Sequence, residues 1–506
     1  PIIEEEIAAH LVQGDDGRAV ARMHLTLPSD DSSPIMDLFA QGEDLKVGST
    51  HKYLPADKLG PKTLEWFDHA LVDGHISTAE FTYKGPMRQF PFRNDEGTFL
   101  ARAQVDSALF DYQKGWQPAR DVAAEVEFRN EGMRVHATAG TVGNLRLTEA
   151  SAEIPDLKHG ELSIKAAAAS DLDAGLAFLR ESPVGPSLGE TFARLGGRGP
   201  MTADVRLDLP LEHLDDRKID VTARLADATL TMQKVSAPVQ SLTGELTVKN
   251  ERIAAADLKG RFLGGPLAVK IEQRSAKAAQ LDAHGHAHAS ELHSLFSLPA
   301  TVKLSGASDY HVSMPIASAD TEAAKRLNIK IESNLRGLGV TLPEPLGKGA
   351  EDQRPLQVAL EVDDEQLLSR SSYGDVRALI RLRQSKNGWT LDRGGVRADA
   401  VAPALPSHRG LRIEGNVQRF VLDDWLALRG ADSNPGAGSG DDDGPKLSDY
   451  LQAANVRVAD FQIFGYRFAD LRGLLQATQS GWRVDVSGDN AAGQVLIPES
   501  FIGTQP

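Results

Sequence analysis

The stretch Ala21-Arg-Met-His-Leu-Thr-Leu27 alternates strictly between apolar and polar side chains, with the apolar ones at the odd positions. Successive side chains of a β-strand point to opposite faces, so this stretch predicts a strand with one apolar and one polar face. The same alternation returns along the chain in the segments 201–209, 242–248 and 327–331. A pattern repeated over hundreds of residues predicts many strands that share an apolar face.

The composition of the 506-residue chain agrees with a folded, mainly β protein. Hydrophobic residues make up 41% and aromatic residues only 6%, so aliphatic side chains must fill the apolar face. The 46 Gly and 26 Pro residues supply turns between short strands. No tandem repeat of fixed length is present, and no linker separates closed domains before residue 432. We expect a long, continuous, twisted antiparallel sheet curled into an open hydrophobic groove, with short helices between strand blocks.

The groove segment is expected to run through residues 1–300 and to continue through 301–506, where the acidic, Gly-rich stretch 432–445 forms a flexible loop. Short amphipathic helices are expected between the strand blocks, at 61–72, 171–180, 188–195, 291–298, 319–327, 423–428 and 446–454. The chain opens Pro1-Ile-Ile-Glu without an initiator Met or a signal-like segment. No window approaches the roughly 20 apolar residues of a membrane-spanning helix. We therefore expect both parts to belong to a longer protein.

Charge and cysteine content exclude several function classes. The net charge of -16 and the pI near 5.4 argue against a protein that binds nucleic acid, which needs a basic surface. The same charge disfavours electrostatic binding to an anionic membrane, so any contact with lipid must be hydrophobic. The absence of cysteine removes thiolate catalysis, Cys-type zinc sites and disulfides. No cofactor is expected.

Three local motifs suggest chemistry, and each has a simpler interpretation. Gly185-Pro-Ser-Leu-Gly189 has the letters of a nucleophile elbow, but it follows a predicted helix, and Pro186 removes an N–H beside Ser187. His284, His286 and His288 would stand roughly 6.6 Å apart on one strand face, a spacing at which imidazoles bind metal, yet they also fit the ordinary polar face. Asp441-Asp-Asp-Gly444 lacks the ligand spacing of a calcium loop. No enzyme motif has positive support.

Several short motifs follow one another in a fixed order: Lys52-Tyr-Leu-Pro-Ala56, Leu64-Glu-Trp-Phe-Asp-His-Ala-Leu71, Phe81-Thr-Tyr-Lys-Gly85, Tyr112-Gln-Lys-Gly-Trp-Gln-Pro118, Leu335-Arg-Gly-Leu-Gly-Val-Thr-Leu-Pro-Glu-Pro-Leu-Gly-Lys348, Gly415-Asn-Val-Gln-Arg-Phe-Val-Leu-Asp-Asp-Trp425 and Phe464-Gly-Tyr-Arg-Phe-Ala-Asp-Leu471. In this order, over about residues 52–497, the set resembles the YhdP family of AsmA-like envelope proteins of Gram-negative bacteria. The resemblance implies a non-enzymatic protein that moves phospholipid between the inner and outer membranes through an apolar groove in the periplasm. It implies contact with the inner membrane through an N-terminal anchor outside this chain, and with the outer membrane, or a partner there, through a missing C-terminal part. It offers no catalytic residues.

A long one-sided sheet must cover its apolar face, because soluble proteins rarely expose large apolar patches. Phospholipid acyl chains in a groove would do so, since each methylene kept from water contributes about 0.8 kcal/mol. The residues expected to line the groove are the apolar ones of the alternating strands: Met23, Leu25, Leu27, Val205, Leu207, Leu209, Leu246, Val248, Val269, Ile271, Ile329, Ile331, Val358 and Leu360.

Three alternatives remain open from the sequence. The same residues could pack against one another in closed sandwiches, without lipid. The sheet could also act as a structural or chaperone-like scaffold for outer-membrane protein assembly, using its exposed strand edges. A serine hydrolase built on Ser187 is a more distant alternative.

Overall fold

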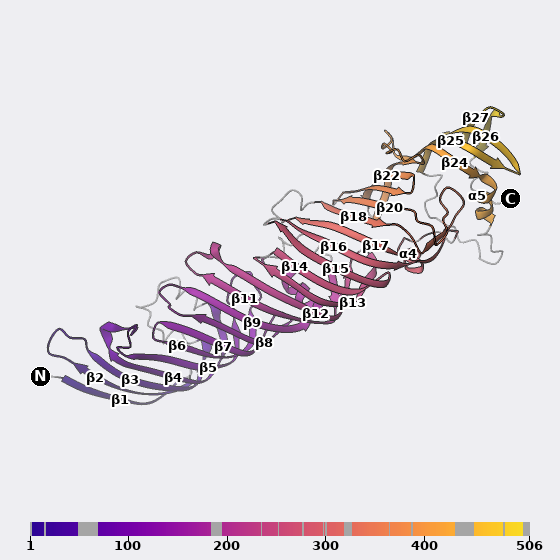
Figure 1. Ribbon diagram of the computed structural model, residues 1–506. Helices are drawn as coiled ribbons and strands as arrows, with labels where there is room; N and C mark the ends of the chain where they lie inside the picture. The colour runs from indigo at the N-terminus through magenta and orange to yellow at the C-terminus, as the bar shows by residue number, and fades with distance from the viewer. Residues whose placement is uncertain are drawn as a thin grey trace. The chain divides into compact units, whose positions relative to one another are not determined.

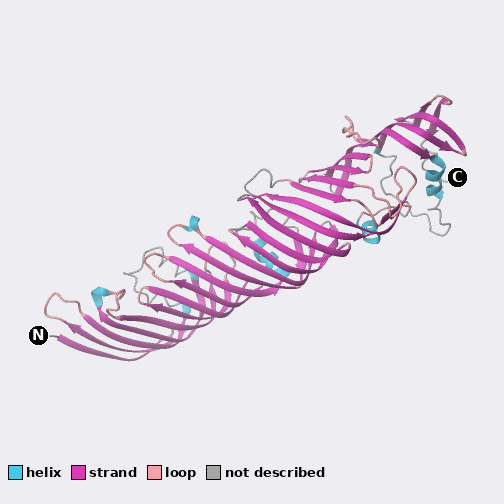
Figure 2. Cartoon of the chain, in the orientation of Figure 1, coloured by secondary structure: helices cyan, strands magenta, loops and turns pink. Residues whose placement is uncertain are grey.

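The computed structural model of the chain consists mainly of strands, with short helices at a few strand ends (Figure 2). The structure describes residues 3–14, 17–48, 69–183, 195–233, 235–250, 252–275, 278–296, 298, 301–317, 326–363, 365–385, 388–430, 450–478 and 481–498. The chain divides into two compact units. Unit 1 comprises Pro1–Lys234 and Pro238–Leu258, and unit 2 comprises Val235–Ala237 and Lys259–Pro506. The mainly β fold class predicted from the alternation is confirmed.

The strands of unit 1 follow one another as a meander, which Figure 1 shows side by side. Each strand from β1 to β9 pairs antiparallel with the next. β11 pairs with β9 and β12, and β10 pairs with β12. The strands are β1 Ile3–Gly14, β2 Gly17–Leu27, β3 Ile35–Lys46, β4 Leu71–Pro86, β5 Thr98–Phe110, β6 Ala119–Arg129, β7 Gly132–Val142, β8 Leu145–Ile154, β9 Glu161–Asp171, β10 Leu195–Arg198, β11 Pro200–Pro210, β12 Lys218–Met232 and β13 Val235–Lys249.

Several strands of unit 1 bend near one end. Asp44, Ser107, Asp121 and Asp227 have a left-handed backbone inside β3, β5, β6 and β12, with φ between 52° and 56°. The registers of β4–β5, β5–β6 and β6–β7 shift close to these residues. An extra residue in one strand of a pair kinks that strand and increases its twist. The bulges therefore bend the sheet along a line that crosses neighbouring strands.

Small residues allow the backbones to approach at the bend. Gly74 in β4 has φ +136°, and a Cβ atom there would lie 2.7 Å from the Cα atom of Ala108. Ala108 and Ala228 are buried, with exposed fractions of 6% and 0%. Only glycine adopts such a φ without strain, and only glycine leaves room for the backbone of β5.

Replacing Gly74 by alanine tests the bend. We expect Gly74→Ala to lower the free energy of unfolding by about 1–3 kcal/mol, because the new methyl group strains the backbone and overlaps Ala108. Chemical denaturation would measure the effect. Gly48→Ala in the same unit is the control, since its added Cβ would meet one carbonyl oxygen at an ordinary 3.4 Å. Equal stability of the two variants would contradict this account of the bend.

Unit 2 contains strands of both directions. Its strands are β15 Gly264–Ser275, β16 Ala278–His288, β17 Lys303–Ala317, β18 Leu327–Ser333, β19 Leu338–Thr341, β20 Leu356–Val362, β21 Gln366–Tyr373, β22 Val376–Ser385, β23 Gly388–Arg397, β24 Gly410–Val421, β25 Leu451–Ile463, β26 Tyr466–Thr478, β27 Gly481–Ser487 and β28 Ala492–Pro498. β14 Arg252–Phe262 contributes residues to both units, and so does β13, whose first three residues belong to unit 2.

The prediction of a wholly antiparallel sheet is wrong at two places. β23 and β24 are parallel, and so are β24 and β25. The long connections after Arg397 and after Val421 return the chain to the same end of the sheet, as parallel neighbours require. The other strand pairs within the described residues of β15 to β28 are antiparallel. Among the described residues neither β1 nor β28 has a second partner strand, so the sheet is not closed into a barrel.

Three of the predicted helices are present: α2 Leu172–Glu181, α4 Ala289–Leu295 and α5 Leu422–Gly430. Two short 3-10 helices, η3 Met87–Gln89 and η5 Leu214–Asp216, lie in turns. The helix predicted at 446–454 is wrong for its last four residues, which begin β25 because they pair with β24. Leu71 and Val72 likewise begin β4. Residues 61–68, 188–194, 319–325 and 432–449 lie outside the described residues.

A single lysine holds the long connection between β18 and β20 in unit 2. The Lys348 ammonium donates hydrogen bonds to the carbonyl oxygens of Leu335, Leu338 and Gly349, at 2.8 Å for Leu335 and 2.7 Å for Gly349. Leu335 and Leu338 pack on Ala289 of α4 and are buried. Lys348 therefore fixes the connection to the helix and to the strands beneath it.

Removing the Lys348 charge should destabilise unit 2. We expect Lys348→Met to lower its free energy of unfolding by about 2 kcal/mol, because several partly buried carbonyl groups lose a charged donor. Denaturant unfolding would measure the loss. The exposed Lys330→Met is a control in the same unit, since its ion pair with Glu332 is at the surface. An unchanged stability of Lys348→Met would contradict the anchoring role.

Candidate functional site

Directly opposed residues on neighbouring strands share a face of the sheet, so the pairing registers reveal the surface of unit 1. One row of opposed residues crosses nine strands and is apolar throughout: Gly42, Ala79, Ala103, Val126, Val135, Ala152, Ile164, Leu207 and Ile219. A parallel row runs through Ala21, Ala40, Phe81, Ala101, Phe128, Met133 and Ile154. We call the face that carries these rows the apolar face.

The opposite face of unit 1 carries charge of alternating sign. Glu80, Arg102, Glu127, Arg134 and Glu153 oppose one another in turn on β4 to β8. Arg102 bonds to Glu127, and the Arg134 Nε atom lies 3.0 Å from Glu153. Because each of these carboxylates stands opposite a guanidinium group, this row forms a solvated outer surface of paired charges.

Unit 2 has an apolar face of the same kind. A row of opposed residues crosses it from β15 to β28, and Ser371 is the one polar residue of this row. Its members are Val269, Ala283, Val312, Ile331, Val358, Ser371, Ala378, Val396, Ile413, Ala454, Leu475, Val484 and Val495. The row continues across the parallel pairs. The change of strand direction therefore leaves the apolar face intact within the unit.

All fourteen residues predicted to line a groove lie in strands, and the pairing registers place the twelve outside β13 on the apolar faces. Those of unit 1 are in β2, β11 and β13, and those of unit 2 are in β15, β18 and β20. Leu27 is 36% exposed, Ile271 is 7% exposed, and the other twelve are half-buried. Residues between two packed sheets are normally buried, so this intermediate exposure indicates a face that the rest of the chain covers only in part.

The sequence prediction missed two parts of the apolar face. Alanines at the same register fill its middle on β6 to β9, at Ala124, Ala137, Ala150 and Ala166. Aromatic side chains fill the region near the β4–β5 turn, where the Tyr83 and Phe92 rings lie 5.2 Å apart and the Phe90 and Phe99 rings also 5.2 Å apart. These alanines follow the period-two pattern, but the predicted lining residues were all large aliphatic residues or methionine.

An ion pair fixes the loop that carries these aromatics. Arg93 forms a two-pronged contact with the Asp156 carboxylate, in which Nη2 and Oδ1 are 2.8 Å apart. The Arg93 guanidinium holds the pKa of Asp156 well below its usual value. Phe92, the neighbour of Arg93, is almost fully buried. The pair therefore ties the 87–97 loop, with its phenylalanines on the apolar face, to the β8–β9 turn.

The ion pair predicts a pH dependence. A carboxyl group with a lowered pKa in the folded state adds stability at a pH above its unfolded pKa near 4, and this stability is lost as the pH falls below that value. We expect wild-type protein to lose more thermal stability between pH 5 and pH 3 than Asp156→Asn. Melting curves at several pH values would measure the difference, and identical pH profiles would contradict the assignment.

The described residues give no support to the nucleophile, histidine metal and calcium sites that were considered from the sequence. His284 stacks on His311 with ring centroids 4.4 Å apart, and His286 Nδ1 lies 2.7 Å from an Asp309 oxygen. In the part of the chain that the structure describes, no group of three side chains could hold a metal ion. The segments 185–189 and 441–444 lie outside the described residues, and the helix expected before the first of them is α2.

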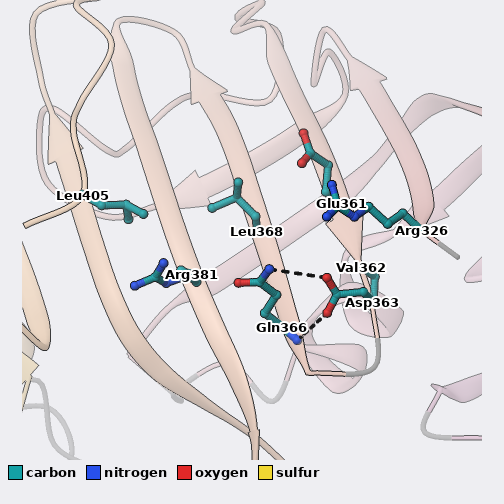
Figure 3. A pocket seen from close by; sticks show the side chains of 8 residues that line it. All are labelled: Arg326, Glu361, Val362, Asp363, Gln366, Leu368, Arg381 and Leu405. Carbon is teal, nitrogen blue, oxygen red and sulfur yellow. Dashed lines mark hydrogen bonds between the residues drawn. The ribbon is translucent and has the colours of Figure 1, made fainter. Parts of the chain in front are cut away.

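A cleft at the β20–β21 turn of unit 2 is polar (Figure 3). Asp363 accepts hydrogen bonds from the backbone and side chain of Gln366, and the backbone bond lowers the pKa of Asp363. Glu361 pairs with Arg370, and Arg381 pairs with Asp392 at 2.7 Å. Its lining contains no nucleophile: Arg326, Glu361, Val362, Asp363, Gln366, Leu368, Arg381 and Leu405. This cleft is a site of structural ion pairs.

Comparison with known proteins identifies the family of the chain. The family model described as "YhdP protein" matches residues 9–506. The chain belongs to the YhdP family. It is 26% identical over 450 residues to the "Intermembrane phospholipid transporter YhdP" of Escherichia coli (strain K12), an alignment that covers 86% of this chain and 34% of that protein. This member of the YhdP family thus spans about a third of the relative's length, and no solved structure matches it.

Within the described residues of this YhdP family member, no helix is both long enough and apolar enough to cross a membrane.

Proposed function

We propose that this chain conducts phospholipids by holding their acyl chains against the apolar faces of its two units, as part of a protein that moves lipid between the inner and outer membranes. The observation that carries the proposal is the unbroken apolar row of unit 1, in which Leu207 stands among residues of nine strands. The similarity to an intermembrane phospholipid transporter supports it. The fourteen predicted residues line the lipid path.

The half-buried state of these residues supports the proposal energetically. An acyl chain that covers them removes its own methylenes and their side chains from water, at about 0.8 kcal/mol for each methylene. A chain that slides along a row exchanges one apolar contact for another, so the barrier to movement is low. The surface itself favours neither direction.

Membership of the family supports the route that we propose. The chain works in the periplasm as part of a protein anchored in the inner membrane of a Gram-negative bacterium, and further parts of that protein reach the outer membrane or a partner there. The charged outer face fits an aqueous surrounding, since its carboxylates and guanidinium groups pair with one another.

Photo-crosslinking in cells tests the proposal. A photoreactive amino acid at Leu207 or Ile329 of the full-length protein should capture phospholipid, because both residues face the apolar side. The matched controls are the sequence neighbours Arg206 and Lys330, which oppose Asp220 and Ser313 on the other face. We expect several-fold less phospholipid at the controls, measured by mass spectrometry of the crosslinked product.

Two outcomes would contradict lipid conduction. One is the absence of phospholipid at both Leu207 and Ile329 in a protein that remains folded and functional. The other is capture of unfolded outer-membrane proteins at the strand edges in place of lipid, which would favour the scaffold function.

A further inference from the structure

The face of unit 2 opposite its apolar face is rich in arginine at β21 to β24. Residues 366–421 contain nine arginines but four Asp and Glu residues, although the whole chain has a net charge of -16. On the charged face of unit 1, by contrast, Arg102, Arg134 and Arg224 each pair with one or two carboxylates. An excess of positive charge therefore gathers in one part of an acidic protein.

Two of these arginines stand directly opposite each other. Arg381 on β22 opposes Arg393 on β23, so both side chains lie on the face opposite to Ala378 of the apolar row. Arg383 follows Arg381 by two residues along β22 and shares this face. We call these three residues the arginine cluster. Like charges at directly opposed positions destabilise a sheet, so the cluster needs an anion to offset its repulsion.

A single carboxylate stands among the three guanidinium groups. Asp392 lies in a β-bulge of β23, where the register with β22 shifts. Its Oδ2 atom is 2.7 Å from Arg381 Nη2, 3.4 Å from Arg383 Nε and 3.7 Å from Arg393 Nε. Among the described residues no other carboxylate forms an ion pair with the cluster. Three cations share one carboxylate, and two positive charges are left without a counterion.

Hydrogen-bond donors of the arginine cluster are also left unused. Burial acts to raise the pKa of Asp392, but the hydrogen bond and charge of Arg381 outweigh it, so the pKa is lowered and the carboxylate is ionised. The Arg393 Nε atom is buried and makes no hydrogen bond within the part of the chain that the structure describes. Arg383 is 62% exposed, so most of its guanidinium group faces solvent. These donors fit a second anion that comes from solution.

The polar cleft of Figure 3 gives access to the cluster, because Arg381 is one of its lining residues. The two carboxylates of the cleft have partners of their own. Glu361 pairs with Arg370, and Asp363 accepts hydrogen bonds from Gln366. The cleft therefore opens the site to solutes without neutralising it.

We propose that the arginine cluster is a binding site for a phosphate group. A phosphate carries negative charge and several acceptor oxygens, and a planar guanidinium group bonds to two such oxygens at once. It offsets the charge that Asp392 leaves and accepts hydrogen bonds from Arg383 and Arg393. The phosphate belongs either to the headgroup of an anionic phospholipid or to a free phosphate ion. Because the site lies on the charged face, it does not depend on lipid conduction along the apolar face.

Vesicle flotation tests the site with the whole 506-residue chain. Vesicles of phosphatidylcholine with phosphatidylglycerol should bind the chain more tightly than vesicles of phosphatidylcholine alone. Arg383→Gln should weaken binding to the anionic vesicles about fivefold, because one guanidinium group loses its contact with phosphate. Arg412→Gln is the matched control, since Arg412 is 51% exposed on the same face and its partner Glu414 keeps the ion pair with Arg397.

Titration calorimetry with inorganic phosphate at constant ionic strength distinguishes the two sources. Vesicle binding that requires Arg383 assigns the site to a lipid headgroup. Binding of inorganic phosphate but not of anionic vesicles, again dependent on Arg383, assigns it to free phosphate. Equal losses in Arg383→Gln and Arg412→Gln would show a diffuse charge effect and overturn the proposal, as would the absence of binding to both probes.

Removing the internal carboxylate tests the site in the opposite direction. Asp392→Asn keeps the shape of the side chain but leaves three guanidinium groups without an anion. We expect this variant to bind the probe that the wild type binds about fivefold more tightly, because the carboxylate no longer competes for the donors. Unfolding curves would show that the variant is folded. Unchanged or weaker binding by folded Asp392→Asn would contradict a site built on excess positive charge.

Discussion

One constraint underlies the whole structure: residues that stand directly opposite each other on neighbouring strands have their side chains on the same face of the sheet. Once the register is set by short turns, the alternation within each strand adds up to rows that cross a whole unit. A slip of one residue would turn every apolar side chain of a strand to the charged face. The ionic row from Glu80 to Glu153 and the apolar row through Leu207 are two results of the same registers.

The bend gives this sheet a second property. In unit 1, left-handed residues and small side chains near one end of several strands bend those strands. α2 covers Met201 and Leu225 in this unit, while α4 packs with Leu335 and Leu338 in unit 2. A helix in each unit therefore covers some apolar residues, whereas twelve of the fourteen residues predicted to line the groove are half-buried. Such a surface suits a ligand that is long, apolar and mobile.

Much of this could be predicted from the sequence. The period-two pattern predicted that Met23, Leu207 and Ile329 lie in strands and share a face with other apolar residues, because the sequence of an antiparallel strand with one solvated face alternates between apolar and polar residues. The same pattern could not predict that β24 pairs parallel with β23 and β25, because the direction of a strand depends on the long connections before and after it. It also could not predict where α2 packs, because the strands that contact Leu172 and Leu176 are set by tertiary structure.

The most direct measurement is a cryo-electron microscopy map of the full-length protein purified with its native lipids. The account predicts elongated density within about 4 Å of Leu207 in unit 1 and of Ile329 in unit 2, on the apolar faces and absent from the charged faces. Apolar faces packed against a second layer of protein, with no space for acyl chains, would contradict it.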